Sequence, residues 1–552
     1  MKNTGNQNLD HSYGRSWFVR ITTWIFFIIL FAWFLYAAES DHLFHVDEGI
    51  HLASARQVLE GGMPGIDFNY PKPGVYLTAA WLMLAGRSLT AIRFLVTMQI
   101  WLIAVILFSW IRRRQDLFHA FLGTAIFSIC AGPLWPIEGG DWTGVVLVIS
   151  GYWMLDSRQD DLKNPAAGRY LKTMGPGLTF SLAGCFFPDL AVFSIISGVV
   201  ILSLNRSRKN HIQLWAFLGS ALVPAAIVAL LLLAGGALRD FLDMGVAGPF
   251  SRWHQFHEMF LPPPVPFMKS SRFAFYGDTT AARLLYLLPL AVALYMVFLL
   301  FDAFMHKGRT RDHESGKTIT IESLMALSGL LTMYPRADLD HLAPAMGLML
   351  PLAVRLLKVP VRHGSVEAPV GAHDARSSGW AGLARWPILA AGLCGTGLML
   401  VAGTMENASR LDFDRAFVQG IPCLEGFPMR PKSARELNSL NKFLRHNVKQ
   451  GELVFAYPDF SYFYFLFDMP PPTRFLDQMF GWIGKRETDE VVRDLERFHV
   501  RYAVKLDVNR PMDGSPLSSY APRLTNYMKE KFVTIAVIGR FKVLKRATAL
   551  MQ

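Results

Sequence analysis

Two short polar stretches near the start of the chain carry the residues best suited to chemistry. The first contains the acidic pair Asp47-Glu48, a few residues after an apolar run, and the second is Tyr70-Pro71-Lys72-Pro73. A carboxylate at a membrane boundary can take a proton from an acceptor or bind a cation. A lysine stiffened between two prolines can contact a phosphate at headgroup level. The structural alternatives are that Asp47 only caps the next helix and that Lys72 is an ordinary interfacial lysine.

Two more clusters contain ionisable residues. Glu138 and Asp141 precede an apolar run and predict a second acidic group beside the first, the alternative being a polar turn through Gly139-Gly140. The short segment 334–341 predicts a phosphate contact, because arginine binds phosphate through two donors and histidine can assist. The alternative is a salt-bridged loop that keeps helix ends in water. Its ionisable residues are Arg336, Asp338, Asp340 and His341.

The segment 237–282 is long for a connection without secondary structure, and such loops are often functional lids. Basic residues alternate there with aromatics and three consecutive prolines. A single His254-x-x-His257 pair is weak evidence for a zinc site, so we predict a loop that covers the substrate. Tyr70, Asp338 and Asp340 are expected to contact the substrate together with this loop. Its basic residues are Arg252, His254, His257, Lys269 and Arg272.

The composition indicates a membrane protein. Of the 552 residues 52% are hydrophobic and 18% are charged, whereas soluble domains carry about 25% charged residues. The net charge of +12 comes largely from lysine and arginine in short loops between apolar runs, as the positive-inside rule expects. These residues form no single patch, which argues against a nucleic-acid partner. Three of the four cysteines lie in apolar runs, so no disulfide framework is expected.

Charge in the loops predicts the topology. Lys2 and Arg15 place the N-terminus in the cytoplasm, and Arg112-Arg113-Arg114 is also cytoplasmic if 71–86 is a re-entrant or juxtamembrane element. The fold class expected is a polytopic α-helical membrane protein with about 11–13 transmembrane helices. All the notable polar groups described above then lie on the external side. The predicted spans are 17–37, 88–111, 117–134, 142–155, 174–187, 190–204, 213–236, 284–304, 319–333, 342–357 and 386–403.

The chain divides into two domains. Residues 1–403 form the transmembrane domain, with external loops 38–87, 237–282 and 334–341, and residues 404–552 form an external soluble α/β domain. In that domain Ser433 and Glu436 resemble a capping box that opens an amphipathic helix. A second helix is expected over 488–498, and strands over 453–457, 500–504 and 532–544. The aromatic-rich stretch 457–475 reads as a surface loop that packs the domain onto its neighbour more readily than it stacks on sugars.

The first external segment resembles a known family. Asp47-Glu48-Gly49, a helix with Arg56, the run from Tyr70 to Leu77 and then Arg93 are similar to GT-C glycosyltransferases of the protein O-mannosyltransferase and aminoarabinose (lipid A) transferase group. The motif-level resemblance covers residues 40–115. It implies a polyprenyl-phosphate sugar donor, inverting transfer and an external active site. It also implies Asp47 as base or acceptor-orienting carboxylate, Glu48 as its assistant and Lys72 on the donor phosphate. One departure is Gly74 in place of a second proline, which predicts a more flexible loop.

The leading hypothesis is a hexosyl- or pentosyltransferase in a bacterial inner (plasma) membrane. It moves a sugar from a polyprenyl-phosphate donor to a lipid, glycan or protein acceptor, with Lys72, Arg336 and His341 at the donor phosphate. A divalent cation, magnesium or manganese, is compatible with Asp47 and Asp141 but is not required by the sequence. A transporter or flippase is the alternative, although it would place ionisable residues at mid-span. A third hypothesis is a scaffold of cell-envelope assembly with 404–552 as its docking module.

Overall fold

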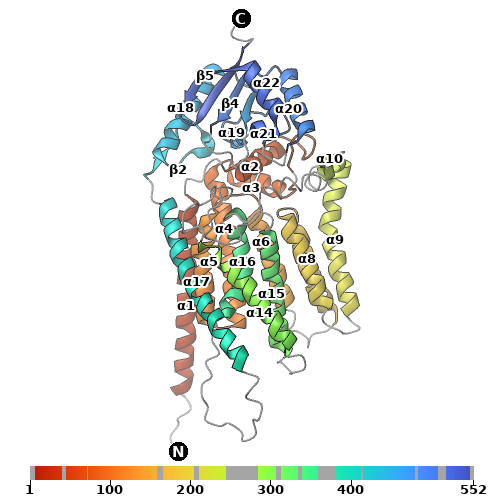
Figure 1. The fold of residues 1–552 in the computed structure, drawn as a ribbon, viewed down its shortest axis with the longest axis vertical. Helices are drawn as coiled ribbons and strands as arrows, with labels where there is room; N and C mark the ends of the chain where they lie inside the picture. Colours follow the sequence, from red (N-terminus) through yellow and green to blue (C-terminus); the bar gives the residue numbers. More distant parts are fainter. Residues whose placement is uncertain are drawn as a thin grey trace, which may run out of the picture.

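The structure is a computed structural model that describes residues 7–39, 45–70, 72–157, 166–203, 210–243, 284–305, 313–333, 339–357, 379–411, 414–478, 483–507 and 517–547. A body of long, roughly aligned helices contains the N-terminus at one end and carries a smaller domain with a β-sheet at the other (Figure 1). Two short helices, α2 (Val46–Leu59) and α3 (Val75–Ala85), lie between the body and this C-terminal domain.

Each predicted span overlaps a helix of the body. Three of these helices are long and apolar enough to cross a membrane by themselves, over Trp17–Ala38, Leu89–Arg114 and His211–Ala234, and several of the others are shorter apolar helices. The body is therefore a polytopic helical membrane domain, as predicted. Its helices are α1 (Gln7–Ala38), α4 (Leu89–Arg114), α5 (Leu117–Cys130), α6 (Asp141–Ser157), α7 (Ala166–Ala183), α8 (Pro188–Ser203), α9 (Asn210–Ala234), α14 (Leu287–Met305), α15 (His313–Thr332), α16 (Leu339–Leu356) and α17 (Gly379–Leu411).

Residues 71–86 do not form a long helix of the body. Their helix, α3, is preceded by Gly74 and ends at Gly86, whose φ of 92° suits glycine. The indole N–H of Trp81 donates to the Ala91 carbonyl at 2.9 Å, so α3 folds back onto the start of α4. Its position beside α2 in Figure 1 agrees with the expected juxtamembrane element.

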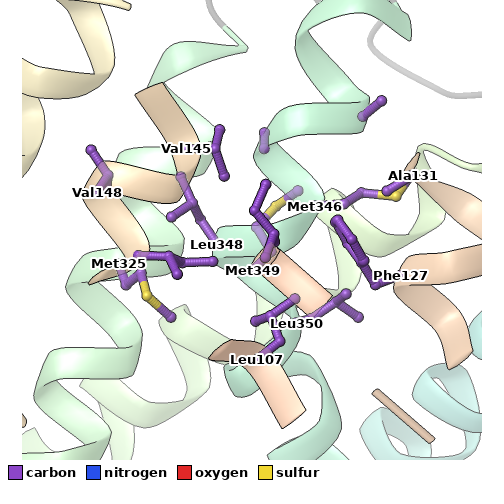
Figure 2. Close-up of a cluster of buried hydrophobic side chains, with 14 of the residues drawn as sticks. Leu107, Phe127, Ala131, Val145, Val148, Met325, Met346, Leu348, Met349 and Leu350 are labelled. Carbon is purple, nitrogen blue, oxygen red and sulfur yellow. The ribbon is translucent and has the colours of Figure 1, made fainter. Parts of the chain in front are cut away.

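Apolar side chains from α4, α5, α6, α15 and α16 fill the centre of the body (Figure 2). Leu107, Phe127 and Val148 meet the methionines and leucines of α16, which is buried along most of its length. The outer helices instead expose large apolar side chains such as Trp215 and Leu231. A helical body that is apolar both at its centre and on its outer surface is suited to a lipid environment.

Two buried ion pairs lie at the end of the body farthest from the C-terminal domain. Arg355, near the end of α16, contacts both carboxylate oxygens of Glu322, with 2.9 Å between Nη2 and Oε1. Arg114, at the end of α4, lies 2.7 Å from Asp156 near the end of α6. These two pairs were not among the polar groups that the sequence predicted on the external side. Arginines at helix ends can reach back to buried carboxylates, and loop charge alone does not reveal that pairing.

The C-terminal domain has the predicted α/β character. Its sheet has the order β3-β4-β6-β5, with β3 (Val454–Tyr457) parallel to β4 (Tyr502–Leu506) and the other pairs antiparallel. The remaining elements are β1 (Ala416–Phe417), β2 (Pro428–Met429), α18 (Pro431–Asn447), α19 (Tyr462–Leu466), α20 (Lys485–Arg497), α21 (Leu517–Tyr520), α22 (Pro522–Lys531), β5 (Phe532–Ile538) and β6 (Phe541–Arg546), with the 3₁₀ turns η1 (Gly132–Leu134) and η5 (Pro422–Leu424) and the short α10 (Leu238–Leu242) elsewhere in the chain.

Three local predictions need correction. Helix α17 continues to Leu411, beyond the apolar run that predicted its end at 403. The capping box is wrong, because α18 begins at Pro431, a residue whose fixed φ suits the first helical position, and Glu436 instead pairs with Arg540 at 2.7 Å. The aromatic stretch is not a surface loop: it contains β-strand and helix, and its tyrosines are buried.

Candidate active site

Asp47 lies at the beginning of α2 with its side chain partly open to solvent. The residue that caps this helix is His45, whose Nδ1 accepts the backbone N–H of Asp47 at 3.2 Å. The Asp47 carboxylate is therefore not used as the helix cap, and 37% of the side chain is exposed. It stands beside the loop before α6: a Cβ atom built on Gly139 would lie 4.0 Å from the Asp47 Cβ and 3.6 Å from Asp141 Oδ2.

Lys72 reaches the same loop from the segment before α3. Its Nζ lies 3.0 Å from Asp141 Oδ1 and donates to the Gly139 carbonyl at 3.1 Å. Burial opposes the charged form and would lower the pKa of Lys72, but Asp141, Tyr70 and Asp47 outweigh burial and raise that pKa above its usual value. Lys72 is thus a fixed cation, 22% exposed. Three residues predicted from the sequence, Asp47, Lys72 and Asp141, form one cluster of a carboxylate, an ammonium and a second carboxylate.

Glu48 has a different environment from its neighbour Asp47. It is fully buried, and each of its oxygens accepts two hydrogen bonds. Oε1 accepts from Arg93 Nη1 at 2.5 Å and from the backbone N–H of Glu138 at 3.0 Å. Oε2 accepts from Arg93 Nη2 and from the hydroxyl of Tyr462, both at 2.8 Å. The expected direct assistance to catalysis does not match this arrangement, because no Glu48 oxygen is left to contact a substrate.

Glu138 is buried beside Glu48, whose Oε1 accepts its backbone N–H, and is not part of the cluster of Asp47, Lys72 and Asp141. It is buried against His51, with Nε2 of the ring 3.5 Å from Glu138 Oε1. His51 also lies 2.7 Å from Thr78 Oγ1 and 2.8 Å from the Tyr70 hydroxyl. Tyr70, expected to contact the substrate, is instead buried as a partner of His51.

Burial shifts the pKa values of Glu138 and His51 in opposite directions. Burial, with the charges of Glu48 and Asp141, raises the pKa of Glu138 from 4.5 to about 7. The folded protein therefore holds a proton between these values that the unfolded chain has released, and Glu138 costs stability as pH rises through that window. Burial and Lys72 lower the pKa of His51 from 6.5 to about 3, so His51 costs stability as pH falls from 6.5 towards 3.

Gly74 is held firmly, in contrast to the flexible loop expected from the missing second proline. Its N–H donates to the Cys185 carbonyl at 2.8 Å. A Cβ atom on Gly74 would lie 2.2 Å from the ring of Phe186, far inside contact distance. The glycine thus permits close packing of the start of α3 on the turn between α7 and α8, which fixes the segment that carries Lys72.

No protein-family model matches the chain, and no curated protein sequence matches it either. Solved structures do match. ArnT from Cupriavidus metallidurans bound to undecaprenyl phosphate superposes with a TM-score of 0.54 and 12% identity, over 96% of this chain and 99% of that chain. The apo state of the same protein gives a TM-score of 0.52 and 14% identity over the same shares. The chain has the GT-C fold. The apo oligosaccharyltransferase from Archaeoglobus fulgidus gives a TM-score of 0.46 and 12% identity, over 87% of this chain and 69% of that chain.

Several predicted site residues of the GT-C body fall outside the described residues. His341 is described and lies in the first turn of α16, which packs against the 3₁₀ turn η1 that leads to Glu138. Asp340 belongs to the same turn of α16, but its side chain is not described. The residues outside the described part are Arg252, His257, Lys269, Arg272, Arg336 and Asp338.

The residues around Glu48 include several that the sequence reasoning did not place in the site. Arg93 carried a signal, since an arginine within an apolar run must find a partner when the helix is buried. His51 and Thr78 also carried a weak signal as polar residues among apolar neighbours. Tyr462 carried none, because it lies 414 residues from Glu48 in the sequence.

The carboxylates of Asp47 and Asp141 are better suited to the Lys72 ammonium than to a metal ion. In the described part of the chain no three His, Cys, Asp or Glu side chains are grouped to hold a metal. Asp47 and Asp141, the predicted ligands, are neighbours, but the Lys72 ammonium already lies 3.0 Å from Asp141. A divalent cation there would face a fixed positive charge at contact distance. The residues of this cluster therefore do not fit a divalent cation.

Proposed function

We propose that the protein is a glycosyltransferase that moves a sugar from a polyprenyl-phosphate donor to an acceptor. One observation carries the proposal: the half-exposed Asp47 carboxylate and the Lys72 ammonium border the same loop, at Gly139 and Asp141, at the end of a body with the fold of ArnT. A base beside a fixed cation is what transfer from a phosphate leaving group requires. The ArnT structure contains undecaprenyl phosphate, which supports the choice of a lipid-linked donor.

In the proposed reaction each charged residue has a separate role. Lys72 contacts the donor phosphate and stabilises the negative charge that grows on it as the sugar leaves. Asp141 and the Gly139 carbonyl hold the ammonium in place. Asp47 accepts the proton of the acceptor hydroxyl or amine. The acceptor atom then bonds to the anomeric carbon as the bond to the phosphate oxygen breaks, and the electron pair leaves with the phosphate. A single displacement of this kind inverts the anomeric centre.

The site is proposed to face the outside of a bacterial plasma membrane. Helix α4 begins against α3, beside the site, and ends in Arg112–Arg114. The first residues of α1 lie at the end of the body away from the C-terminal domain (Figure 1). Positive residues at the ends of spans favour the cytoplasm. The acceptor is then an extracytoplasmic lipid, glycan or protein, and the C-terminal domain is external.

The test is transfer by the purified full-length chain in liposomes, with a panel of radiolabelled polyprenyl-phosphate sugars and a membrane extract as acceptor source. Asp47→Asn keeps the shape of the side chain but removes the base, so the rate should fall by about 10²–10⁴-fold. Asp414→Asn, at an exposed aspartate in the C-terminal segment, is the control and should leave the rate unchanged. Undiminished transfer by Asp47→Asn would overturn the assignment of the base.

The same experiment separates transfer from transport. A glycosyltransferase releases free polyprenyl phosphate in step with the glycosylated product. A flippase moves the intact lipid-linked sugar across the bilayer and releases none. Movement of the donor without release would favour the transporter. In the described part of the body the buried charged residues away from the site include Glu406 of α17 and the pairs Glu322–Arg355 and Asp156–Arg114. The two arginines are already paired, so they are poorly suited to bind a transported anion.

A further inference from the structure

The C-terminal domain contacts α2 at its first turn, next to Asp47. The Tyr462 hydroxyl of α19 donates to Glu48 Oε2 at 2.8 Å, and both side chains are buried. The backbones approach closely at this point. A Cβ atom on Gly49 would lie 2.8 Å from the Tyr462 nitrogen and 2.9 Å from Ser461 Oγ. Glycine is the residue that allows α2 and α19 to touch here.

A second contact joins the same two elements farther along α2. Arg56, near the end of α2, is buried and donates from Nη1 to the Tyr464 carbonyl at 2.5 Å and to the Met469 carbonyl at 2.7 Å. Its Nε donates to Glu60 Oε1 at 2.9 Å. The C-terminal domain thus holds α2 at both of its ends, through one side-chain carboxylate and one guanidinium.

Apolar packing makes the junction continuous. Ile50 and Leu52 of α2 belong to one buried cluster with Val75 of α3 and with Phe463 and Leu437 of the C-terminal domain. The hydrophobic core of the C-terminal domain therefore extends into the helices that carry the site. The C-terminal domain also has a second buried cluster of its own, which includes Phe455, Val491 and Leu524. A docking module joined by a linker would have only such a cluster, with a polar surface against its neighbour.

Resting on the proposed function, we propose that the C-terminal domain is a structural part of the active site and that Tyr462 is a positioning residue. Asp47 precedes Glu48 in the first turn of a rigid helix, so a group that fixes Glu48 also fixes the direction of the Asp47 carboxylate. Arg93 fixes Glu48 from the membrane body and Tyr462 fixes it from the C-terminal domain. Without the tyrosine hydroxyl, Glu48 keeps its partners in the body but α2 loses one of its two supports on the outer side.

The test compares Tyr462→Phe with Tyr464→Phe in the full-length chain. Both tyrosines are buried in α19, and each variant loses one hydroxyl. The Tyr464 hydroxyl accepts the Ala456 N–H inside the C-terminal domain, at 3.1 Å, and does not touch Glu48. The Tyr464 carbonyl that binds Arg56 remains in both variants. We expect Tyr462→Phe to lower kcat by about tenfold or more, because small misplacements of a catalytic group are costly, with little change in the KM for the donor. Tyr464→Phe should leave both constants near wild type.

Hydrogen exchange provides a second readout that does not need transferase activity. Backbone amides of α2, Val46–Leu59, should exchange faster in Tyr462→Phe than in the wild type, and at wild-type rates in Tyr464→Phe. Equal effects of the two variants on kcat, or unchanged exchange in α2, would overturn the positioning role. If the wild type transfers no sugar, the proposed function fails, while the exchange experiment still decides whether Tyr462 holds α2.

Discussion

Replacing Glu48 or Arg93 with alanine should destabilise the fold strongly, and replacing both should cost much less than the sum. Their side chains form a buried ion pair with two hydrogen bonds, at 2.5 and 2.8 Å. In Glu48→Ala the Arg93 guanidinium keeps the Pro136 carbonyl as its hydrogen-bond acceptor. In Arg93→Ala the buried carboxylate keeps only Tyr462 and the Glu138 N–H. Each single variant leaves a buried charge without its counter-charge.

The size of the effect follows from this burial. Removing one partner of a buried pair costs about 3–5 kcal/mol. Independent losses would then sum to roughly 6–10 kcal/mol. The double variant leaves no uncompensated charge, only a cavity, which costs about 2–5 kcal/mol. We therefore expect a coupling energy of at least about 1 kcal/mol between the two sites, and about 4 kcal/mol for costs in the middle of these ranges.

The measurement is equilibrium unfolding in mixed micelles with increasing SDS, followed by far-UV circular dichroism. Asp507→Ala is the control, because Asp507 pairs with Lys542 at 2.7 Å on the exposed surface of the C-terminal domain, where a pair contributes under about 1 kcal/mol. Single variants that lose less than about 1 kcal/mol, or a double variant equal to the sum of its singles, would refute the reasoning.

Two other variants test residues next to the cluster of Asp47, Lys72 and Asp141. Glu138→Gln should abolish the loss of stability that the wild type shows as pH rises from 4.5 to about 7. The stability of the variant relative to the wild type should therefore be up to about 3 kcal/mol greater at pH 8 than at pH 4. Identical pH slopes in the micelle assay would contradict this. Gly74→Ala places a Cβ atom 2.2 Å from Phe186 and should cost about 1–3 kcal/mol by overpacking. Gly219→Ala is the control, because a Cβ atom on this glycine of α9 would have no atom within 4 Å, and it should be neutral or slightly stabilising. Equal thermal stability of the two variants would argue against the close packing at Gly74.

Much of the membrane body was predictable because a span is a local property. A run of apolar residues long enough for the bilayer is read directly from the sequence, and each long helix of the body overlaps one of the predicted runs. Asp47 and Lys72 were also found locally, as polar residues beside such runs. The sequence was less informative about helix ends: α17 continues to Leu411, because a helix can leave the membrane without ending.

The pairing of side chains was not predictable, because it depends on how helices pack. Asp47 and Glu48 are adjacent in sequence, yet successive residues on a helix point about 100° apart. One is therefore half exposed beside the Gly139 loop, and the other contacts Arg93 in the interior. The sequence by itself determined that an acidic pair lies at a membrane boundary of a polytopic protein. Only the tertiary structure decided which carboxylate is open to a substrate, and that Tyr462, from a domain 414 residues away, holds the other.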